Sequence, residues 1–257
     1  MPSVRVASPS EDEEISRMFF HAFRETWDQN WFQGLSALLE PLPSLLATPQ
    51  PSQASRILFY SAFLSLTRMI GGEIWVATQQ IDEKEVIVSA MAWLPPYKRV
   101  TARNPWALYQ SGYLRLMYLW GWRGIYRVLF AYDSKMNHLY YETLAQKNIQ
   151  SKSCAKVQLI GTDPKHAGHG YGTALLKHKL DKMDQESPSV PIILDTATPL
   201  ARKMYARAGF RDLGEIPIAV GECDAFGLTI TSAVKETNAE MCLWKIWAML
   251  RPAKTSH

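Results

Sequence analysis

One stretch, residues 157–183, constrains the fold more than any other part of the chain. It opens with apolar residues that predict a buried strand, passes Pro164, and continues through three glycines at alternate positions, Gly168, Gly170 and Gly172. From Thr173 the apolar residues recur every three or four positions, which predicts a helix. A glycine loop between a strand and a helix N-terminus presents free backbone N–H groups and the positive end of the helix dipole. The stretch therefore predicts a site for a phosphorylated ligand.

The spacing of this loop excludes two familiar kinds of phosphate loop. No Lys-Ser or Lys-Thr follows the last glycine, although the loop of a nucleotide hydrolase requires one. The dinucleotide pattern Gly-x-Gly-x-x-Gly is not met either, because the three glycines are spaced by two throughout. The ligand is therefore expected to belong to another class.

A second stretch follows at once and has the same alternation of elements. Residues 191–198 predict a short buried strand, and Thr198 before Pro199 is typical of a helix N-cap with proline at the first helical position. The predicted helix covers Leu200–Ala208, and Gly209 ends it. The next strand is expected to begin directly after this glycine.

Together the two stretches, roughly residues 155–216, resemble the coenzyme A region of the GNAT superfamily of acetyltransferases. The family loop has Arg or Gln, two residues, Gly, one residue, then Gly or Ala, commonly after Asp-Pro. Asp163-Pro164, Gly170 and Gly172 match this pattern, whereas Ala167 stands where Arg or Gln is expected. The resemblance implies an α/β (α+β) fold, in which helices flank a mixed, mostly antiparallel sheet, and one domain over residues 1–257.

The resemblance also implies acetyl-CoA as cosubstrate and a set of residues that bind it. Backbone groups of one strand segment would hold the pantetheine arm, namely Leu159, Ile160, Gly161 and Thr162. The loop and helix start would hold the pyrophosphate, namely Ala167, Gly168, His169, Gly170, Tyr171, Gly172 and Thr173. Thr198 and Tyr205 would also lie at the coenzyme.

Acyl transfer to an amine needs a base for the ammonium and an acid for the leaving thiolate. Tyr205 matches the family tyrosine that protonates the coenzyme sulfur, and a phenol of ordinary pKa is protonated at neutral pH. Asp195, on the strand beside the coenzyme strand, is the first candidate for the base. Other candidates for the base are ordered water and three side chains, Glu73, His138 and Glu142.

The remaining segments predict the elements that this fold requires. A strand is expected around Val4 and Val6, and a helix that opens with a capping box at Ser10–Glu13. Residues 28–52 predict an irregular segment or a short helix. The elements expected after it are a helix over Ser55–Met69, a hairpin of Glu73–Gln79 and Glu85–Leu94 with its turn at Ile81–Lys84, a strand over 211–220, a loop over Gly221–Asn238 and a strand over Met241–Met249.

Residues 97–150 form a predicted helical insertion that the minimal family pattern lacks. Eleven of the 29 aromatic residues lie between Trp106 and Tyr141. Helical spacing places five large side chains on one stripe: Trp106, Tyr109, Tyr113, Met117 and Trp120. Three arginines interrupt the apolar run, so neither a membrane span nor a membrane partner is expected. The insertion is expected to cover the sheet, to line a pocket for an apolar or aromatic acceptor, or to do both.

Composition excludes several other classes of function. The net charge of +4 is not gathered into runs, so no nucleic-acid partner is expected. The three cysteines have no metal spacing, and no carboxylate or cysteine completes a set with His166, His169 and His178, so no metal is expected. The N-terminus has no apolar leader, which predicts a cytoplasmic protein.

The expected acceptor is the primary amine of a small molecule, because the aromatic insertion would narrow the site and no acidic groove for basic tails is visible. Two alternatives remain open: a protein or peptide N-acetyltransferase, and a non-catalytic acyl-CoA-binding domain that acts as sensor or scaffold. Ala167, in place of the family's Arg or Gln, favours the non-catalytic domain, whereas the presence of Tyr205 argues against it. The sequence leaves open whether the protein is a monomer or a homodimer.

Overall fold

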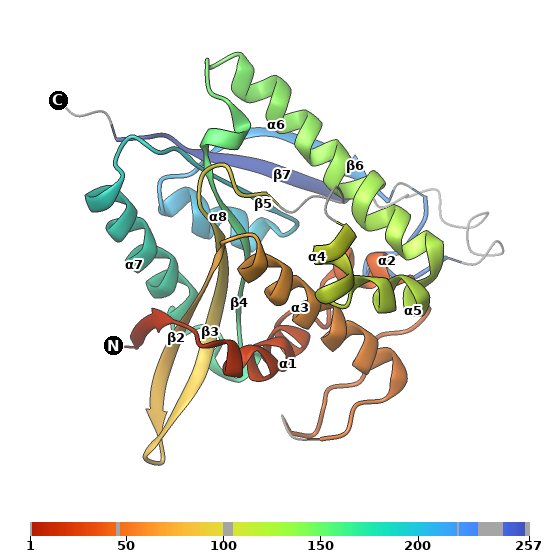
Figure 1. Ribbon diagram of the computed structural model, residues 1–257. Coiled ribbons are helices and arrows are strands. Elements are labelled where there is room, and N and C mark those ends of the chain that lie inside the picture. Colours follow the sequence, from red (N-terminus) through yellow and green to blue (C-terminus); the bar gives the residue numbers. More distant parts are fainter. Residues whose placement is uncertain (1, 45–46, 100–104, 220, 231–243, 255–257) are drawn as a thin grey trace.

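The computed structural model describes residues 2–44, 47–99, 105–219, 221–230 and 244–254 of the chain. Within them seven strands form one sheet in the order β1-β2-β3-β4-β5-β7-β6 (Figure 1). The strands are β1 (Ser3–Val6), β2 (Glu73–Ile81), β3 (Lys84–Leu94), β4 (Ala155–Thr162), β5 (Ile192–Thr196), β6 (Arg211–Ile218) and β7 (Trp244–Arg251). Every neighbouring pair is antiparallel except β4 and β5. The predicted mixed, mostly antiparallel sheet is therefore confirmed.

Helices cover both faces of this sheet and create two apolar cores. The first face carries α1 (Asp12–Ala22), α2 (Trp27–Gln33) and α3 (Pro51–Met69), and the second carries α7 (Tyr171–Glu186) and α8 (Pro199–Arg207). Strand alternation separates the cores: Ile74 and Val76 of β2 pack with the first, whereas Trp75 and Ala77 pack with the second.

The N-terminal capping box lies two residues earlier than predicted. The backbone N–H of Ser8, not that of Ser10, donates to the side chain of Glu11 at 2.6 Å, and a short 3-10 helix, η1 (Pro9–Glu11), precedes α1. Pro9 explains the shift, because proline fits the first helical position and so moves the cap to the residue before it.

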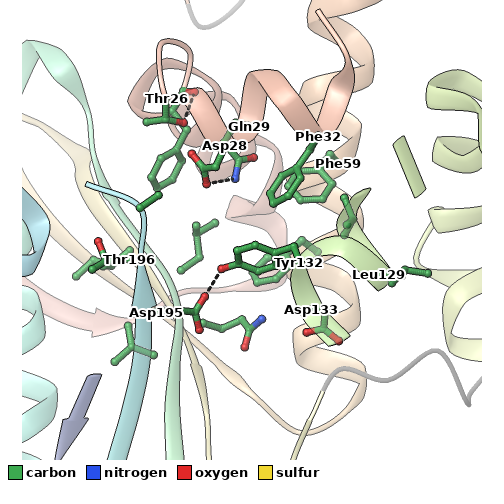
Figure 2. Close-up of a pocket in the computed structure, with 18 of the residues that line it drawn as sticks. Thr26, Asp28, Gln29, Phe32, Phe59, Leu129, Tyr132, Asp133, Asp195 and Thr196 are labelled. Atoms are coloured by element: carbon green, nitrogen blue, oxygen red, sulfur yellow. Dashed lines mark hydrogen bonds between the residues drawn. The ribbon is translucent and has the colours of Figure 1, made fainter. Parts of the chain in front are cut away.

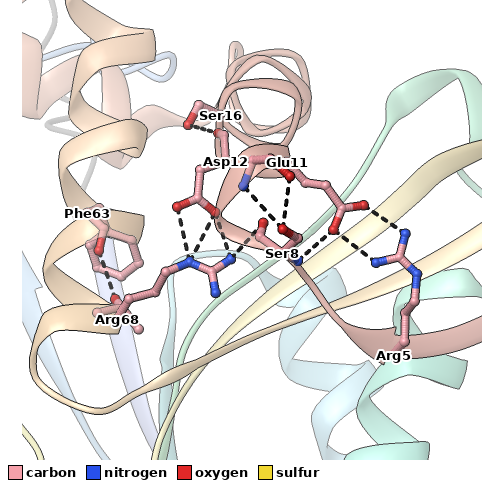
Figure 3. A network of polar contacts seen from close by, with 9 residues as sticks. Arg5, Ser8, Glu11, Asp12, Ser16, Phe63 and Arg68 are labelled. Carbon is pink, nitrogen blue, oxygen red and sulfur yellow. Dashed lines mark hydrogen bonds and ion pairs between the residues drawn. The ribbon is translucent and has the colours of Figure 1, made fainter.

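The same turn connects three elements through two ion pairs (Figure 3). Arg5 of β1 contacts Glu11 at 2.7 Å, and Arg68 of α3 contacts Asp12 of α1 at 2.8 Å. A nitrogen of Arg68 also donates to the backbone oxygen of Ser8 at 3.2 Å. These contacts fix the start of α1 relative to the sheet and to α3.

Helix α3 begins four residues before the predicted start at Ser55. Pro51 occupies its first turn, and the backbone N–H of Gln50 donates to the Gln53 side chain at 2.7 Å. The hairpin is confirmed, with a register from Glu73↔Trp93 to Ile81↔Lys84. Its turn residues, Asp82 and Glu83, both have positive φ, as a two-residue hairpin turn requires.

The insertion is helical, as predicted, but its aromatic stripe is not a buried face. It contains α4 (Pro105–Gln110), α5 (Tyr113–Tyr126), the π-helix η2 (Arg127–Ser134) and α6 (Lys135–Ala145). Trp120 is buried, whereas Trp106, Tyr109 and Met117 are exposed. Gly112, at φ +90°, separates α4 from α5, so the helical spacing that predicted the stripe is broken there.

The C-terminal predictions are met where the structure describes the chain. Strand β6 covers most of residues 211–220, and β7 begins at Trp244 within the predicted 241–249 and extends to Arg251. Residues 221–230 of the predicted loop contain a single bridge, Cys223↔Thr229, and residues 231–238 lie outside the described part. Two further 3-10 turns are η3 (Ser151–Ser153) and η4 (Pro164–His166). Among the described helices, none has the length and apolarity that a membrane crossing needs.

Candidate functional site

Strands β4 and β5 separate partway along their length. They pair in parallel from Ala155↔Ile192 to Val157↔Leu194, after which β4 continues to Thr162 paired only with β3. The β5-facing edge of residues 158–162 therefore has no partner among the described strands. Leu159, Ile160, Gly161 and Thr162, predicted to hold the pantetheine arm, all lie in this segment. An open strand edge can pair with an extended ligand through its backbone groups.

The glycine loop follows this edge and leads directly into α7. Asp163 accepts a hydrogen bond from the backbone N–H of Lys165 at 2.9 Å and so caps η4. Helix α7 begins at Tyr171, two residues before the predicted start. Its first backbone hydrogen bond runs from the N–H of Ala174 to the carbonyl oxygen of Gly170, at 2.9 Å. The N–H groups of Tyr171, Gly172 and Thr173, in the first turn of α7, have no partner within the helix and thus remain available to an anion.

The glycines of this region have different tasks. Gly168 and Gly170 have φ of +81° and +78°, and a Cβ on either would meet nothing within 4 Å. A Cβ on Gly172 would instead approach the Thr162 hydroxyl to 2.8 Å, and one on Gly161 would crowd Phe23 at 3.0 Å. Gly172 and Gly161 therefore permit close packing, whereas Gly168 and Gly170 shape an exposed, open loop.

The other predicted loop residues lie on the surface beside this helix start. Ala167 and His169 are exposed, and Nδ1 of His169 lies 3.1 Å from the backbone oxygen of Ala167. The His169 ring stacks on Tyr171 with centroids 5.8 Å apart, and the Tyr171 hydroxyl donates to Gln79 of β2. Side chains of His169 and Tyr171 thus form one wall of the loop.

Helix α8 carries Tyr205 to the point where β4 and β5 diverge. Thr198 caps α8 as predicted, since its hydroxyl accepts from the N–H of Ala201 at 3.3 Å. Tyr205 is buried, packs edge-to-face on Phe210, and its hydroxyl makes no hydrogen bond with the described residues. Burial, with a smaller contribution from the charge of Asp195, raises the pKa of Tyr205 above its usual value. Its hydroxyl therefore stays protonated at neutral and mildly alkaline pH.

A cavity of about 300 Å³ lies between the diverging strands and the insertion (Figure 2). Its walls include Leu159 and Ile160 of β4, Thr198 next to β5, and Tyr205 of α8. Much of the remaining wall is aromatic and comes from α1, α2, α3 and the insertion: Phe23, Phe32, Phe59, Phe63, Tyr113, Phe130 and Tyr132. The insertion therefore both covers the sheet and lines a pocket, as the sequence had allowed.

Asp195 is held in a cluster of its own at one side of this cavity. Its carboxylate lies 2.9 Å from Nζ of Lys156, and both side chains are nearly buried. The hydroxyl of Tyr132 donates to one oxygen, and that of Tyr140 donates to the other at 3.2 Å. Burial, reinforced by this carboxylate, raises the pKa of both tyrosines well above the usual value. Both oxygens of the Asp195 carboxylate are therefore already engaged, by one cation and two hydroxyl donors.

Two further carboxyl groups line the cavity, and the sequence analysis did not identify either. Asp28 of α2 accepts from the side-chain amide of Gln29 at 3.2 Å and forms no ion pair with a described residue, and it lies across the cavity from Asp195 (Figure 2). Asp133 of the insertion accepts from Asn137 at 2.9 Å. Burial raises the pKa of both carboxyl groups. The only sequence signal for Asp28 was a carboxyl group within an otherwise aromatic segment.

The other side chains considered as bases lie away from the cavity walls. His138 and Glu142 are exposed on α6 and contact each other at 3.1 Å. Glu73, at the partly exposed start of β2, contacts Nζ of Lys179 at 2.7 Å and accepts from the Trp75 indole at 2.7 Å. No group of three His, Cys, Asp or Glu side chains arranged to hold a metal occurs in the described part of the chain.

Comparisons with known proteins agree with this architecture. Residues 131–221 match the family model described as an acetyltransferase (GNAT) domain. No curated protein sequence is significantly similar to the chain.

Several solved structures share the fold at low sequence identity. A Corynebacterium glutamicum protein, described as histone acetyltransferase HPA2 and related acetyltransferase, is 18% identical with a TM-score of 0.58, over 99% of this chain and 98% of that one. Arylalkylamine N-acetyltransferase 2 from Aedes aegypti is 12% identical with a TM-score of 0.56, over 98% of this chain and 99% of that one. Drosophila melanogaster polyamine N-acetyltransferase is 13% identical with a TM-score of 0.51, over 97% of this chain and 99% of that one.

The family match covers the end of the π-helix, α6, the open edge of β4, the glycine loop, α7, β5, α8 and β6, which carry the proposed coenzyme side of the site. The structural similarities extend the same fold over nearly the whole chain. The resemblance seen in the sequence is thus confirmed: the chain has the fold of the GNAT acetyltransferases, and residues 131–221 match the domain model of that superfamily.

Proposed function

We propose that this protein is an N-acetyltransferase that uses acetyl-CoA and acetylates the primary amine of a small apolar or aromatic molecule. One observation carries the proposal: the edge of β4 that no described strand pairs, Tyr205 and Asp28 all line one largely aromatic cavity. The donor site, an acid, a base and an acceptor pocket are thereby contiguous.

The donor side fits a coenzyme A molecule. The open backbone edge of residues 158–162 matches an extended pantetheine arm, and the free N–H groups at the start of α7 match a pyrophosphate. The empty space above Gly168 and Gly170 leaves room for close approach of the phosphates. Ala167 supplies no long polar side chain, so the backbone and the helix dipole would carry most of the phosphate binding.

The acceptor side fits an amine attached to an apolar body. Several aromatic rings form the cavity wall, and the carboxyl group of Asp28 forms no ion pair with a described residue. A neutral amine must lose a proton as it attacks, and a carboxyl group whose pKa is raised by burial is a stronger base than an ordinary aspartate. We therefore assign the role of base to Asp28 rather than to Asp195.

In the reaction, the amine nitrogen attacks the thioester carbon, and the bond from that carbon to sulfur breaks. The proton of the nitrogen passes to Asp28, directly or through one water molecule. The departing thiolate takes the proton of the Tyr205 hydroxyl, which has no competing hydrogen bond with a described residue. Solvent then returns a proton to the phenolate. Known proteins with this fold, an arylalkylamine and a polyamine N-acetyltransferase among them, act on small amines and support this acceptor class.

A thiol-release assay with acetyl-CoA and a panel of amines tests the proposal. Arylalkylamines and alkylamines should be turned over faster than a lysine-containing peptide, because the insertion encloses the acceptor side of the cavity. Faster turnover of the peptide would indicate a protein N-acetyltransferase. Binding of acetyl-CoA without turnover of any amine would favour the second candidate, an acyl-CoA sensor or scaffold, which Ala167 supports.

A further inference from the structure

The insertion exposes an unusual amount of apolar surface. Of the sixteen large hydrophobic side chains that are exposed in the described part of the chain, nine lie between Trp106 and Phe130. Six of these are aromatic: Trp106, Tyr109, Tyr118, Trp122, Tyr126 and Phe130. We call them the aromatic face. Exposed apolar patches of this kind mark interaction sites, because water solvates them poorly.

Five of the six rings of the aromatic face contact another ring of the set. Trp106 and Tyr109 of α4 have ring centroids 5.8 Å apart. Trp122, Tyr126 and Phe130 form a ladder at i, i+4 and i+8, with centroid distances of 6.2 Å and 5.9 Å. Tyr118 and Trp122 are the most exposed of the set, at 87% and 74%. Such rings offer broad apolar faces with polar hydroxyl or indole N–H groups at their edges.

The exposed charged side chains of α4 and α5 are all positive. The sequence has no Asp or Glu from residue 86 to residue 132, but it has six Lys or Arg residues there. Two of them, Arg115 and Arg123, are exposed on α5 and form no ion pair with a described residue. Trp and Tyr together with arginine are the side chains that favour the headgroup region of a bilayer, and arginine also attracts anionic lipids.

We propose that the aromatic face of α4, α5 and η2 docks on the surface of an anionic lipid membrane. The described helices are too short or too polar to cross a bilayer, so the contact is peripheral. A second copy of the chain fits this face less well. A two-fold interface through it would bring Arg115 and Arg123 of both copies together, and the one carboxyl group on the described part of α4, α5 and η2, that of Asp133, lines the cavity and accepts from Asn137.

The aromatic face also borders the cavity. Phe130, the last ring of the ladder, is exposed and at the same time lines the cavity together with Leu129 and Tyr132. A membrane bound to this face would therefore lie beside the pocket. The docking proposal itself does not depend on acyl transfer, because it rests only on the surface and its charge.

Vesicle sedimentation tests the proposal with the full chain. We expect the protein to bind vesicles that contain roughly one third phosphatidylserine in phosphatidylcholine, to bind pure phosphatidylcholine more weakly, and to lose binding as salt is raised. Two double variants, Tyr118→Ser/Trp122→Ser and Arg115→Glu/Arg123→Glu, should each bind the anionic vesicles at least about tenfold more weakly. Circular dichroism should show both variants folded, since all four side chains are exposed.

Matched controls come from α8, where Leu200 and Lys203 are also exposed. Leu200→Ser and Lys203→Glu remove exposed apolar area and positive charge elsewhere, in smaller amounts, and both should bind anionic vesicles like the wild-type protein. Three results would overturn the proposal. They are absence of vesicle binding by the wild-type protein, equal binding by all variants, or a wild-type dimer in sedimentation equilibrium that Tyr118→Ser/Trp122→Ser converts to monomer.

Discussion

Lys156 and Asp195 form a nearly buried ion pair, with Nζ and Oδ1 2.9 Å apart, at the point where β4 and β5 separate. The last parallel pair of these strands is Val157↔Leu194, so Asp195 is the first residue of β5 beyond it. The ion pair therefore stabilises the branch from which the open edge of β4 and the cavity both begin. This location gives Asp195 a structural task that sequence alone did not suggest.

Removing the cation of this pair should destabilise the protein strongly. Lys156→Met leaves a buried carboxylate without its partner, which we expect to cost roughly 3–5 kcal/mol in the free energy of unfolding. Urea unfolding at neutral pH measures this loss. The double variant Lys156→Met/Asp195→Asn should recover part of it, because the remaining group is uncharged. Equal stability of Lys156→Met and wild type would show that the pair contributes nothing to the branch.

Asp28→Asn should lower kcat/KM by about 10²–10⁴-fold, as expected for a lost general base. In the wild-type protein, kcat/KM should fall as the pH falls through the pKa of Asp28, and burial sets this pKa above that of an ordinary aspartate. The variant should lack this acidic limb. A pH–rate profile of wild type, Asp28→Asn and Asp195→Asn separates the two carboxyl groups. If only Asp195→Asn removes the limb, the base is Asp195, as the sequence had predicted.

Asp28→Asn should also stabilise the folded protein at neutral pH. The pKa of Asp28 is higher in the folded state, so the folded protein binds this proton more tightly than the unfolded chain does. Wild-type stability from this group is thus greatest below the unfolded pKa of about 3.9 and declines as the pH rises through the folded pKa. Because asparagine does not ionise, the Asp28→Asn protein does not lose this stability as the pH rises. Melting temperatures from pH 4 to pH 8 should therefore show an advantage that grows with pH.

Tyr205→Phe should lower kcat by ~10²–10⁴-fold and leave KM nearly unchanged, because the ring is kept and only the proton donor is lost. Steady-state kinetics with acetyl-CoA and the best amine measures both constants. Tyr205→Ala is the comparison, since it also empties a buried site and should weaken stability and binding together. A wild-type rate in the Phe variant would leave solvent as the acid.

Gly170→Val should abolish binding of acetyl-CoA while the protein remains folded. Gly170 has φ of +78° and open space where a Cβ would lie, so valine strains the loop and fills the space proposed for the pyrophosphate. Gly209→Val is the matched control, because Gly209 has φ of +91° in the turn after α8 and its Cβ would meet no atom closer than 3.7 Å. Calorimetry should find binding in Gly209→Val only. Similar affinity in both variants would locate the phosphates elsewhere.

Local chemistry explains why much of the fold could be predicted from the sequence. The glycine loop uses positive φ, the Thr198 cap of α8 uses a side-chain oxygen, and the strands of the β2–β3 hairpin carry alternating or continuous apolar residues, so the sequence itself indicates the position of each. Errors of two to four residues arose where a proline moved a cap, as at Pro9 and Pro51.

The candidate site was predictable on its donor side only. The open edge of β4 and the start of α7 are made by consecutive residues, so one stretch of sequence determined them. The roles of Asp28 and Asp195 required the tertiary structure. Burial, ion pairing with Lys156 and access to the cavity are set by residues far apart in the chain, and the charge a carboxyl group carries depends on those neighbours rather than on its own segment.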